Sequence, residues 1–294
     1  VSRFSSFSCE IWSRGTAVLK GDRLRQSTLT TRIMSRRRFD STDVWAFINA
    51  MSTPETVLIT GAAGLFGGIL RQHWRHRYEL RLADLKQIDD LSPHETFLQT
   101  DITDLGQMTK ACEGASTVVH LAAYPGDGGD FYDALLQLNV IGAYNAFEAA
   151  RRAGCRRLVF ASSVDAVLGY WDEGEIGVEE PVFPTNVYGA TKCWGEALAR
   201  VYSSQHGLSC LCVRLVNPFY DPQADHDVEQ LTSGISPADA AALLARCVEI
   251  EDLDFAIVNG ISRHKKGVLD WRPTRDILGF EPQDGTAAPG TAGK

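Results

Sequence analysis

A short apolar run followed by three evenly spaced glycines constrains this chain more than any other feature. The run Val57–Ile59 has the β-branched, apolar character of a buried parallel strand. It leads into Gly61, Gly64 and Gly67, which stand three residues apart. In a strand–turn–helix unit, the first glycine permits the tight turn, the second lets backbone approach a pyrophosphate, and the third lets the helix pack on the sheet. The pattern predicts a dinucleotide-binding turn.

The next strand supports this interpretation, because the same glycine pattern also occurs in turns that bind no ligand. The apolar segment Glu79–Asp84 ends in a carboxylate 23 residues after Gly61. An acid at this place bonds the adenosine ribose hydroxyls in dinucleotide-binding folds. Asp84 would also repel a 2′-phosphate, which favours NAD over NADP. A helix from Leu65 to about Trp74 would point its first N–H groups at the phosphates.

Two further segments would complete the cofactor site. Asp101 follows a third short strand and would reach the adenine amino group. The segment Val118–Ala123 reads as a buried strand that ends in small residues, which suit close approach of a cofactor. His120 lies within that strand, and we interpret it as a packed core residue.

A tyrosine and a lysine downstream carry the catalytic chemistry. Tyr188 and Lys192 are four residues apart, so they share one face of a helix predicted near Val187–Ser204. An ammonium near a phenol lowers the pKa of the phenol, and such a tyrosine can exchange the proton that accompanies hydride transfer. Ser163 ends the predicted strand Leu158–Ser163 at the carboxyl edge of the sheet, where open parallel sheets bind ligands. It would hydrogen-bond the substrate oxygen.

Over roughly residues 55–285, these motifs resemble the extended short-chain dehydrogenase/reductase superfamily, also called the NAD-dependent epimerase/dehydratase family. They fall in family order, and 25 residues separate Ser163 from Tyr188. The resemblance implies a Ser163–Tyr188–Lys192 catalytic triad, NAD as cofactor and no metal. The expected cofactor-binding residues are Gly61, Gly64, Leu65, Phe66, Gly67, Asp84, Asp101, Ile102, Leu121, Ala122, Ala123, Asn139, Tyr188 and Lys192.

Within that superfamily, the chain looks most like the compact branch that contains uronate dehydrogenases and archaeal NAD-dependent hexose-phosphate dehydrogenases. The resemblance is carried by the segments Asn139–Gly154, Tyr188–Arg200 and Ile257–Ser262, and more weakly by Leu278–Asp284.

Two departures from that branch concern the substrate. The branch usually reads Ser-Ser-Asn-His after the fifth strand, whereas this chain has Val164 and Asp165 at the last two positions. Uronate enzymes also carry an arginine after the sixth strand, whereas no Lys or Arg occurs between Arg214 and Arg246. A neutral or differently held substrate is therefore compatible with the sequence. Asp165 either contacts a sugar hydroxyl or is an exposed turn acid. The expected substrate contacts are Pro125, Val164, Asp165 and Asn217.

Charge and cysteine usage limit the class of protein. Residues 1–50 hold nine Lys/Arg and four Asp/Glu, while the rest of the chain has a net charge of −13. The strongly negative charge of residues 51–294 argues against nucleic acid as a partner. We interpret residues 1–50 as a largely disordered extension with no secretory signal or membrane span. Seven cysteines without metal-ligand spacing suit a reducing cytoplasm, in which we place the protein.

Strand and helix patterns alternate from Glu55 to Arg214, which predicts an α/β fold with a doubly wound parallel sheet, the Rossmann fold. Strands are expected to begin near 56, 79, 97, 117, 157 and 209, with an amphipathic helix near 131–153. We assign residues 51–214 to an NAD-binding domain. Residues 215–294 would form a small interleaved substrate-binding cap with a disordered tail.

The leading functional hypothesis is an NAD-dependent dehydrogenase of carbohydrate metabolism that moves a hydride between a sugar or sugar-acid hydroxyl and NAD. One alternative is a nucleotide-sugar epimerase or dehydratase that recycles NAD within each turnover. A third is a non-catalytic dinucleotide-binding protein, against which the intact Ser163, Tyr188 and Lys192 argue. A homodimer formed through the 131–153 and Tyr188 helices would be typical of the resemblance.

Overall fold

The computed structural model describes residues 55–218, 233–264 and 267–285. The chain divides into the units Val1–Thr53 and Pro54–Lys294, and every described residue belongs to the second. The extension expected over residues 1–50 and the tail over 286–294 therefore lie outside the described residues. None of the helices in the described ranges is long and apolar enough to cross a membrane.

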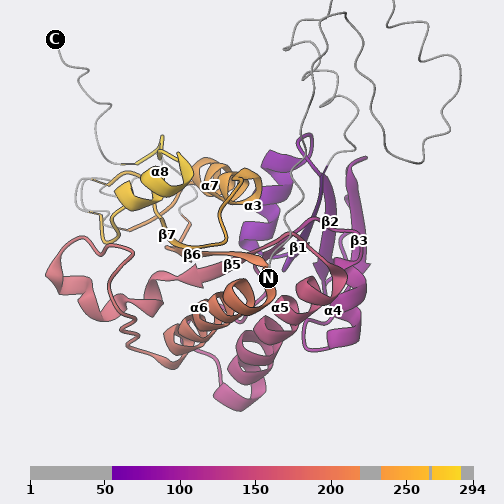
Figure 1. Ribbon diagram of the computed structural model, residues 1–294, viewed down its shortest axis with the longest axis horizontal. Coiled ribbons are helices and arrows are strands. Elements are labelled where there is room, and N and C mark those ends of the chain that lie inside the picture. Colours follow the sequence, from indigo (N-terminus) through magenta and orange to yellow (C-terminus); the bar gives the residue numbers. More distant parts are fainter. Residues whose placement is uncertain (1–54, 219–232, 265–266, 286–294) are drawn as a thin grey trace, which may run out of the picture. The chain divides into compact units, whose positions relative to one another are not determined.

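One parallel sheet of seven strands organises the second unit (Figure 1). The strand order is β3-β2-β1-β4-β5-β6-β7, so the chain builds outward from β1 in one direction and from β4 in the other. This is the doubly wound order that the sequence predicted, with its switch point between β1 and β4. The strands are β1 (Thr56–Thr60), β2 (Glu79–Asp84), β3 (Glu95–Gln99), β4 (Thr117–His120), β5 (Arg157–Ser163), β6 (Ser209–Leu215) and β7 (Phe255–Gly260).

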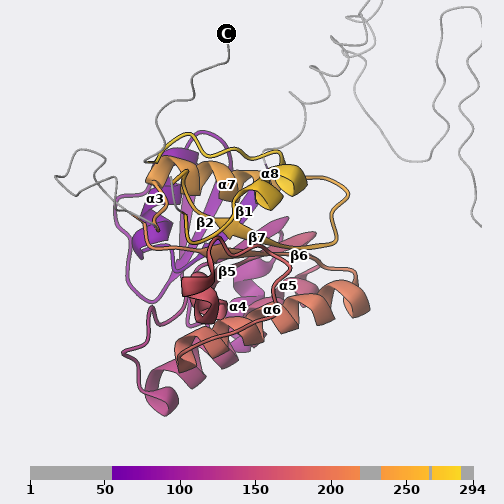
Figure 2. The ribbon, with the colours of Figure 1, turned by 90° about the vertical axis from the view of Figure 1, so that its left-hand side faces the viewer.

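Helices cover both faces of the sheet (Figures 1 and 2). One face carries α4, α5 and α6, and the other carries α3, α7 and α8. Their bounds are α3 (Leu65–Trp74), α4 (Leu105–Cys112), α5 (Gly142–Ala153), α6 (Val187–His206), α7 (Pro237–Glu249) and α8 (Arg272–Leu278). A π-helix, η1 (Phe131–Ile141), precedes α5, and two short 3-10 helices follow β5 as η2 (Val164–Ala166) and η3 (Leu168–Glu173).

The core is split by the sheet into two apolar layers. Val57 and Ile59 of β1 point into the layer under α3 and α7, while Leu58 points into the layer under α4, α5 and α6. Side chains alternate across a strand, so a central parallel strand must be apolar on both faces. This double burial explains why the strands read as continuous apolar runs in the sequence.

Most predicted elements are confirmed, with differences at their ends. Strand β3 begins at Glu95 rather than near 97. Its first residue is a carboxylate that accepts hydrogen bonds from Arg71, at 3.0 Å, and from the backbone of Ser92, at 2.9 Å, so polar contacts rather than apolar character place it. The helix predicted near 131–153 is two elements, because η1 has π geometry and only the second half is an α-helix.

The C-terminal segment is interleaved with the sheet. Strand β7 pairs with β6 in parallel and extends the sheet. Helix α7 has Ser236 as its N-cap and Pro237 in its first turn. It packs against α3, where the Trp74 indole donates to the carbonyl of Ala241 at 3.1 Å. The role of this segment as a substrate cap stays a prediction.

Candidate active site

The glycine turn brings the end of β1 against the end of β4. Gly61 has φ +71°, a left-handed conformation that favours glycine. A Cβ there would lie 2.8 Å from the backbone nitrogen of Ala122. The missing side chain therefore lets two strand ends approach at the carboxyl edge of the sheet, where a ligand can lie on bare backbone.

Helix α3 begins without a cap. Its N-cap residue is Gly64, which has no side chain to accept from the first N–H groups, and its first turn holds no acid. Asp104 caps α4, Asn186 caps α6 and Ser236 caps α7, whereas α5 and α8, like α3, begin without a side-chain cap. The N–H groups at the start of a helix need a partner, and the helix dipole there favours an anion. The start of α3 is therefore suited to a phosphate group.

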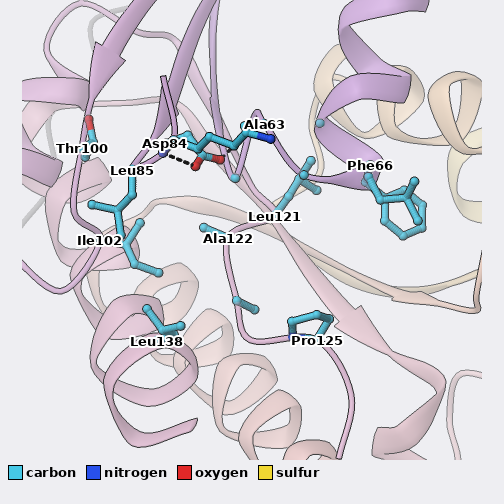
Figure 3. A pocket seen from close by; sticks show the side chains of 16 residues that line it. Ala63, Phe66, Asp84, Leu85, Thr100, Ile102, Leu121, Ala122, Pro125 and Leu138 are labelled. Atoms are coloured by element: carbon cyan, nitrogen blue, oxygen red, sulfur yellow. Dashed lines mark hydrogen bonds between the residues drawn. The ribbon is translucent and has the colours of Figure 1, made fainter. Parts of the chain in front are cut away.

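Asp84 ties the end of β2 to the glycine turn. One carboxylate oxygen accepts from the backbone N–H of Ala63 at 2.9 Å (Figure 3), and the other accepts from the backbone N–H of Lys86 at 2.9 Å. These bonds fix the carboxylate, which is half-buried. Each oxygen keeps a further lone pair with which it can accept from a ligand hydroxyl.

A cavity of about 400 Å³ joins these features (Figure 3). It is lined by Gly61, Ala63, Gly64, Leu65, Phe66, Gly67, Asp84, Leu85, Lys86, Thr100, Ile102, Leu121, Ala122, Ala123, Pro125 and Leu138. Ten of the residues predicted to bind the cofactor are in this lining, together with Pro125, which was predicted to contact substrate. The sequence prediction missed Ala63, Leu85, Lys86, Thr100 and Leu138. All but Lys86 adjoin a predicted residue in the chain, which was the available signal.

Four predicted cofactor residues are not in this lining: Tyr188 and Lys192, which are described below, and Asp101 and Asn139. The carboxylate of Asp101 accepts from the backbone and hydroxyl of Thr103 at 2.8 and 2.7 Å, and so closes a local turn. The amide of Asn139 is buried, accepts from the backbone of Tyr124 at 2.7 Å and donates to Thr191 at 3.1 Å. Asn139 thus connects the segment after β4 to helix α6.

The three predicted catalytic residues come together from β5 and α6. Ser163 is the last residue of β5, and Tyr188 and Lys192 lie in the first turns of α6. Asn186 fixes the start of that helix, because its side-chain oxygen accepts from the backbone of Gly189 at 2.6 Å. The neighbouring Ser162 is committed elsewhere, since its hydroxyl donates to the buried Glu196 at 2.7 Å. Ser163 is therefore the serine that remains for the site.

Lys192 is buried beneath Tyr188. Its ammonium donates to the carbonyl of Ala161 at 2.8 Å and lies 5.4 Å from the centroid of the Tyr188 ring. Burial lowers the pKa of Lys192 to about 8, although the negative charge of Asp165 opposes this shift. Burial lowers the pKa of His120 to about 3, and the positive charge of Lys192 adds to this shift. His120 is 2% exposed and bonded to Thr60, as expected of a core residue.

The expectation that Lys192 lowers the pKa of Tyr188 is wrong. The pKa of the Tyr188 phenol is raised, first by burial and then by the negative charge of Asp165. Hydrogen bonding with the Ser163 hydroxyl and with the backbone of Gly126 opposes the rise but does not outweigh it. Gly126 follows Pro125 of the cavity lining, so Tyr188 lies beside that end of the cavity.

Asp165 is held by two elements at once. One carboxylate oxygen accepts from the Ser163 hydroxyl at 2.8 Å, and the other accepts from the Asn186 amide at 2.8 Å. Val164 lies between the two residues of the first bond and is half-buried. Asn217 lies just past β6, and its carbonyl accepts from the backbone of Ile235 at 3.1 Å. Contact of these residues with a substrate stays a prediction.

Within residues 55–218, 233–264 and 267–285, no group of three or more His, Cys, Asp or Glu side chains is arranged to hold a metal ion. The six cysteines in these ranges, Cys112 and those after it in the chain, are free thiols.

A doubly wound sheet with an uncapped helix start, a fixed acid at the end of β2, and serine, tyrosine and lysine at its carboxyl edge is typical of a class of dinucleotide-binding proteins. The chain matches the model of the NAD dependent epimerase/dehydratase family over residues 57–245. It belongs to that family.

Individual relatives agree. The chain is 33% identical over 234 residues to a uronate dehydrogenase of Agrobacterium fabrum, covering 79% of this chain and 86% of the relative. It is 31% identical to an NAD-dependent glucose-6-phosphate dehydrogenase of Haloferax volcanii, covering 79% and 95%. Among solved structures, a variant of the uronate dehydrogenase of Agrobacterium tumefaciens in complex with NAD is 30% identical, with a TM-score of 0.71 and coverage of 81% and 92%.

Proposed function

We propose that this chain is an NAD-dependent dehydrogenase that oxidises a hydroxyl of a sugar or sugar acid, with Ser163, Tyr188 and Lys192 as its catalytic residues. The observation that carries the proposal is that the groups suited to a cofactor and the groups suited to catalysis lie at the same carboxyl edge of the sheet. The uncapped start of α3 and the fixed carboxylate of Asp84 lie in one cavity, and Tyr188 lies beside the Pro125 end of that cavity.

The residues present fit a dinucleotide. Bare backbone at Gly61, with no room for a Cβ, supports a pyrophosphate on the first N–H groups of α3. Asp84 would accept from the adenosine ribose hydroxyls, and the apolar side chains of Ile102 and Leu138 would pack against the adenine. When bound, NAD would supply a hydride acceptor at its nicotinamide ring.

Each catalytic residue has a role that follows from its contacts. Tyr188 would take the proton of the substrate hydroxyl as the hydride leaves carbon, because its phenol interacts with both Ser163 and Gly126, the residue that follows Pro125 of the cavity lining. Ser163 would hold the substrate oxygen. Lys192, anchored to Ala161, would use its remaining N–H donors to hold the nicotinamide ribose hydroxyls.

The relatives support the reaction class. Uronate and glucose-6-phosphate dehydrogenases oxidise sugars or sugar acids, and the chain covers most of their length. We propose the same class of reaction here. We also propose that residues 215–294 shape the substrate side of the site, and that α6 and the η1–α5 segment form a homodimer interface.

The experiment is a measurement of net NADH after mixing the protein with NAD and a panel of aldoses and uronates. A dehydrogenase accumulates NADH in proportion to the oxidised sugar. An epimerase or dehydratase would instead change nucleotide sugars without net NADH, so product analysis with UDP-sugars separates the two classes. Failure to form NADH with every sugar would contradict the proposal.

A further inference from the structure

The bond between Ser163 and Asp165 has a consequence for the substrate. The Ser163 hydroxyl has one proton, and it is donated to Asp165 at 2.8 Å. The backbone N–H of Asp165 donates back to the same hydroxyl oxygen at 3.1 Å. These two bonds tie the Asp165 carboxylate directly to the catalytic serine.

Both carboxylate oxygens of Asp165 accept hydrogen bonds from neighbouring side chains. Its second oxygen accepts from the Asn186 amide at 2.8 Å, and Asn186 in turn caps α6. An ionised carboxylate accepts at both oxygens, whereas a protonated one gives up acceptor capacity. The geometry therefore holds a negative charge directly behind the catalytic serine.

The two buried cations of this region are engaged with other partners. The Lys192 ammonium donates to the carbonyl of Ala161 at 2.8 Å. The Arg214 guanidinium, in a residue that is 1% exposed, forms two bonds of 2.9 and 3.0 Å with Glu196. Downstream, residues 215–245 contain no Lys or Arg. Among the described residues Asp165 is hydrogen-bonded by the neutral side chains of Ser163 and Asn186, so its charge can act on the substrate, with the Lys192 ammonium near enough to oppose it.

We propose that the carboxylate of Asp165, held by Ser163 and Asn186, selects an uncharged sugar or polyol and disfavours a substrate that carries a carboxylate or phosphate. This inference rests on the proposed function and names its substrate class. A substrate oxygen bonded to Ser163 lies about 5–6 Å from the Asp165 carboxylate, two hydrogen-bond lengths away. A carboxylate or phosphate elsewhere on the same sugar lies farther away than this oxygen, so repulsion by Asp165 disfavours the charged sugar by about threefold in kcat/KM.

Matched sugar pairs test this proposal. D-glucose is compared with D-glucuronate, and D-galactose with D-galacturonate, by the kcat/KM for NADH formation. The wild-type protein is expected to prefer the aldose by about threefold or more. Asp165→Asn keeps the shape of the side chain without its charge, and it should shift the ratio toward the uronate by about threefold.

Asp252→Asn is the control, because it removes the same charge from an exposed loop residue before β7, at the opposite edge of the sheet. Its φ of +53° is one that asparagine tolerates. This variant should leave the ratio unchanged.

A wild-type preference for the uronate would overturn the inference and leave the proposed dehydrogenase standing. So would an unchanged ratio in an Asp165→Asn protein that melts like the wild type. Absence of NADH with all four sugars would instead contradict the proposed function, and with it the inference. If Asp165→Asn does not fold, the ratio of kcat/KM between aldose and uronate in the wild-type protein is the test of the inference.

Discussion

A methyl group on Gly67 would lie 2.5 Å from the carbonyl oxygen of Gly61, whereas one on Gly68 would meet no atom within 4 Å. These adjacent glycines of α3 therefore form a matched pair. The first is required for the helix to lie against the turn, and the second is not.

Gly67→Ala should push α3 away from the glycine turn. We expect it to destabilise the protein by about 1–3 kcal/mol, as overpacking does, and to weaken NAD binding by at least about tenfold. Gly68→Ala should keep NAD affinity and raise stability by up to about 1 kcal/mol, because alanine is the better helix former. Calorimetric NAD titration and thermal melting measure both effects. Equal NAD affinity in the two variants would argue against phosphate binding at this turn.

The pH dependence of oxidation should move to lower pH in Asp165→Asn. The phenolate of Tyr188 is the base, and the carboxylate of Asp165 raises the pKa of that phenol by disfavouring its negative charge. Removal of the carboxylate charge should lower this pKa, so the active phenolate appears at lower pH. The measurement is kcat/KM against pH, with Asp252→Asn as the control. A shift of the profile to higher pH would contradict this assignment.

Lys192→Met should stabilise the protein while removing its activity. Burial lowers the pKa of Lys192 to about 8, so below pH 8 the folded protein carries a buried charge that the unfolded chain solvates. The variant should therefore be more stable at pH 7, by about 1–3 kcal/mol after the lost bond to Ala161 is allowed for.

The pH dependence of that gain has a definite sign. Between pH 8 and the ordinary lysine pKa of about 10.4, the unfolded wild-type chain binds a proton that the folded one has released, so wild-type stability rises with pH. The advantage of Lys192→Met should accordingly fade toward pH 10 in urea unfolding. An advantage that grows with pH would contradict burial of an ionisable lysine at this place.

An apolar stripe on α6 should mediate self-association. Val187, Trp194 and Val201 stand seven residues apart on this helix and are 54%, 40% and 48% exposed. Side chains at this spacing lie along one side of a helix. Val201→Glu should shift a dimer to monomer in light scattering, while Leu91→Glu, a change at an apolar residue with similar exposure away from α6, should not. A dimer that persists in Val201→Glu would exclude this face.

Local pattern was enough to predict much of the fold. Short apolar runs placed β1, β2, β5 and β6. These signals lie within a few residues of the chain. The π geometry of η1 was not predicted, because apolar spacing does not distinguish it from an α-helix.

The site was predictable to the extent that its residues lie next to a motif. Leu138 of the cavity comes from η1, whose approach to the glycine turn depends on tertiary packing. The pKa of Tyr188 depends on burial and on Asp165, and neither can be read from the spacing to Lys192. The hydrogen bonds of Asp101 and Asn139 likewise depend on neighbouring residues that lie outside the cofactor-binding motifs.

The central claim is that Tyr188 transfers the proton that accompanies hydride transfer to NAD. Its most direct measurement is net NADH formation by the wild-type protein and by Tyr188→Phe, with NAD affinity determined for both. We expect kcat to fall by about 10²–10⁴-fold in Tyr188→Phe while NAD affinity changes by less than about threefold. An unchanged kcat in Tyr188→Phe would contradict the claim.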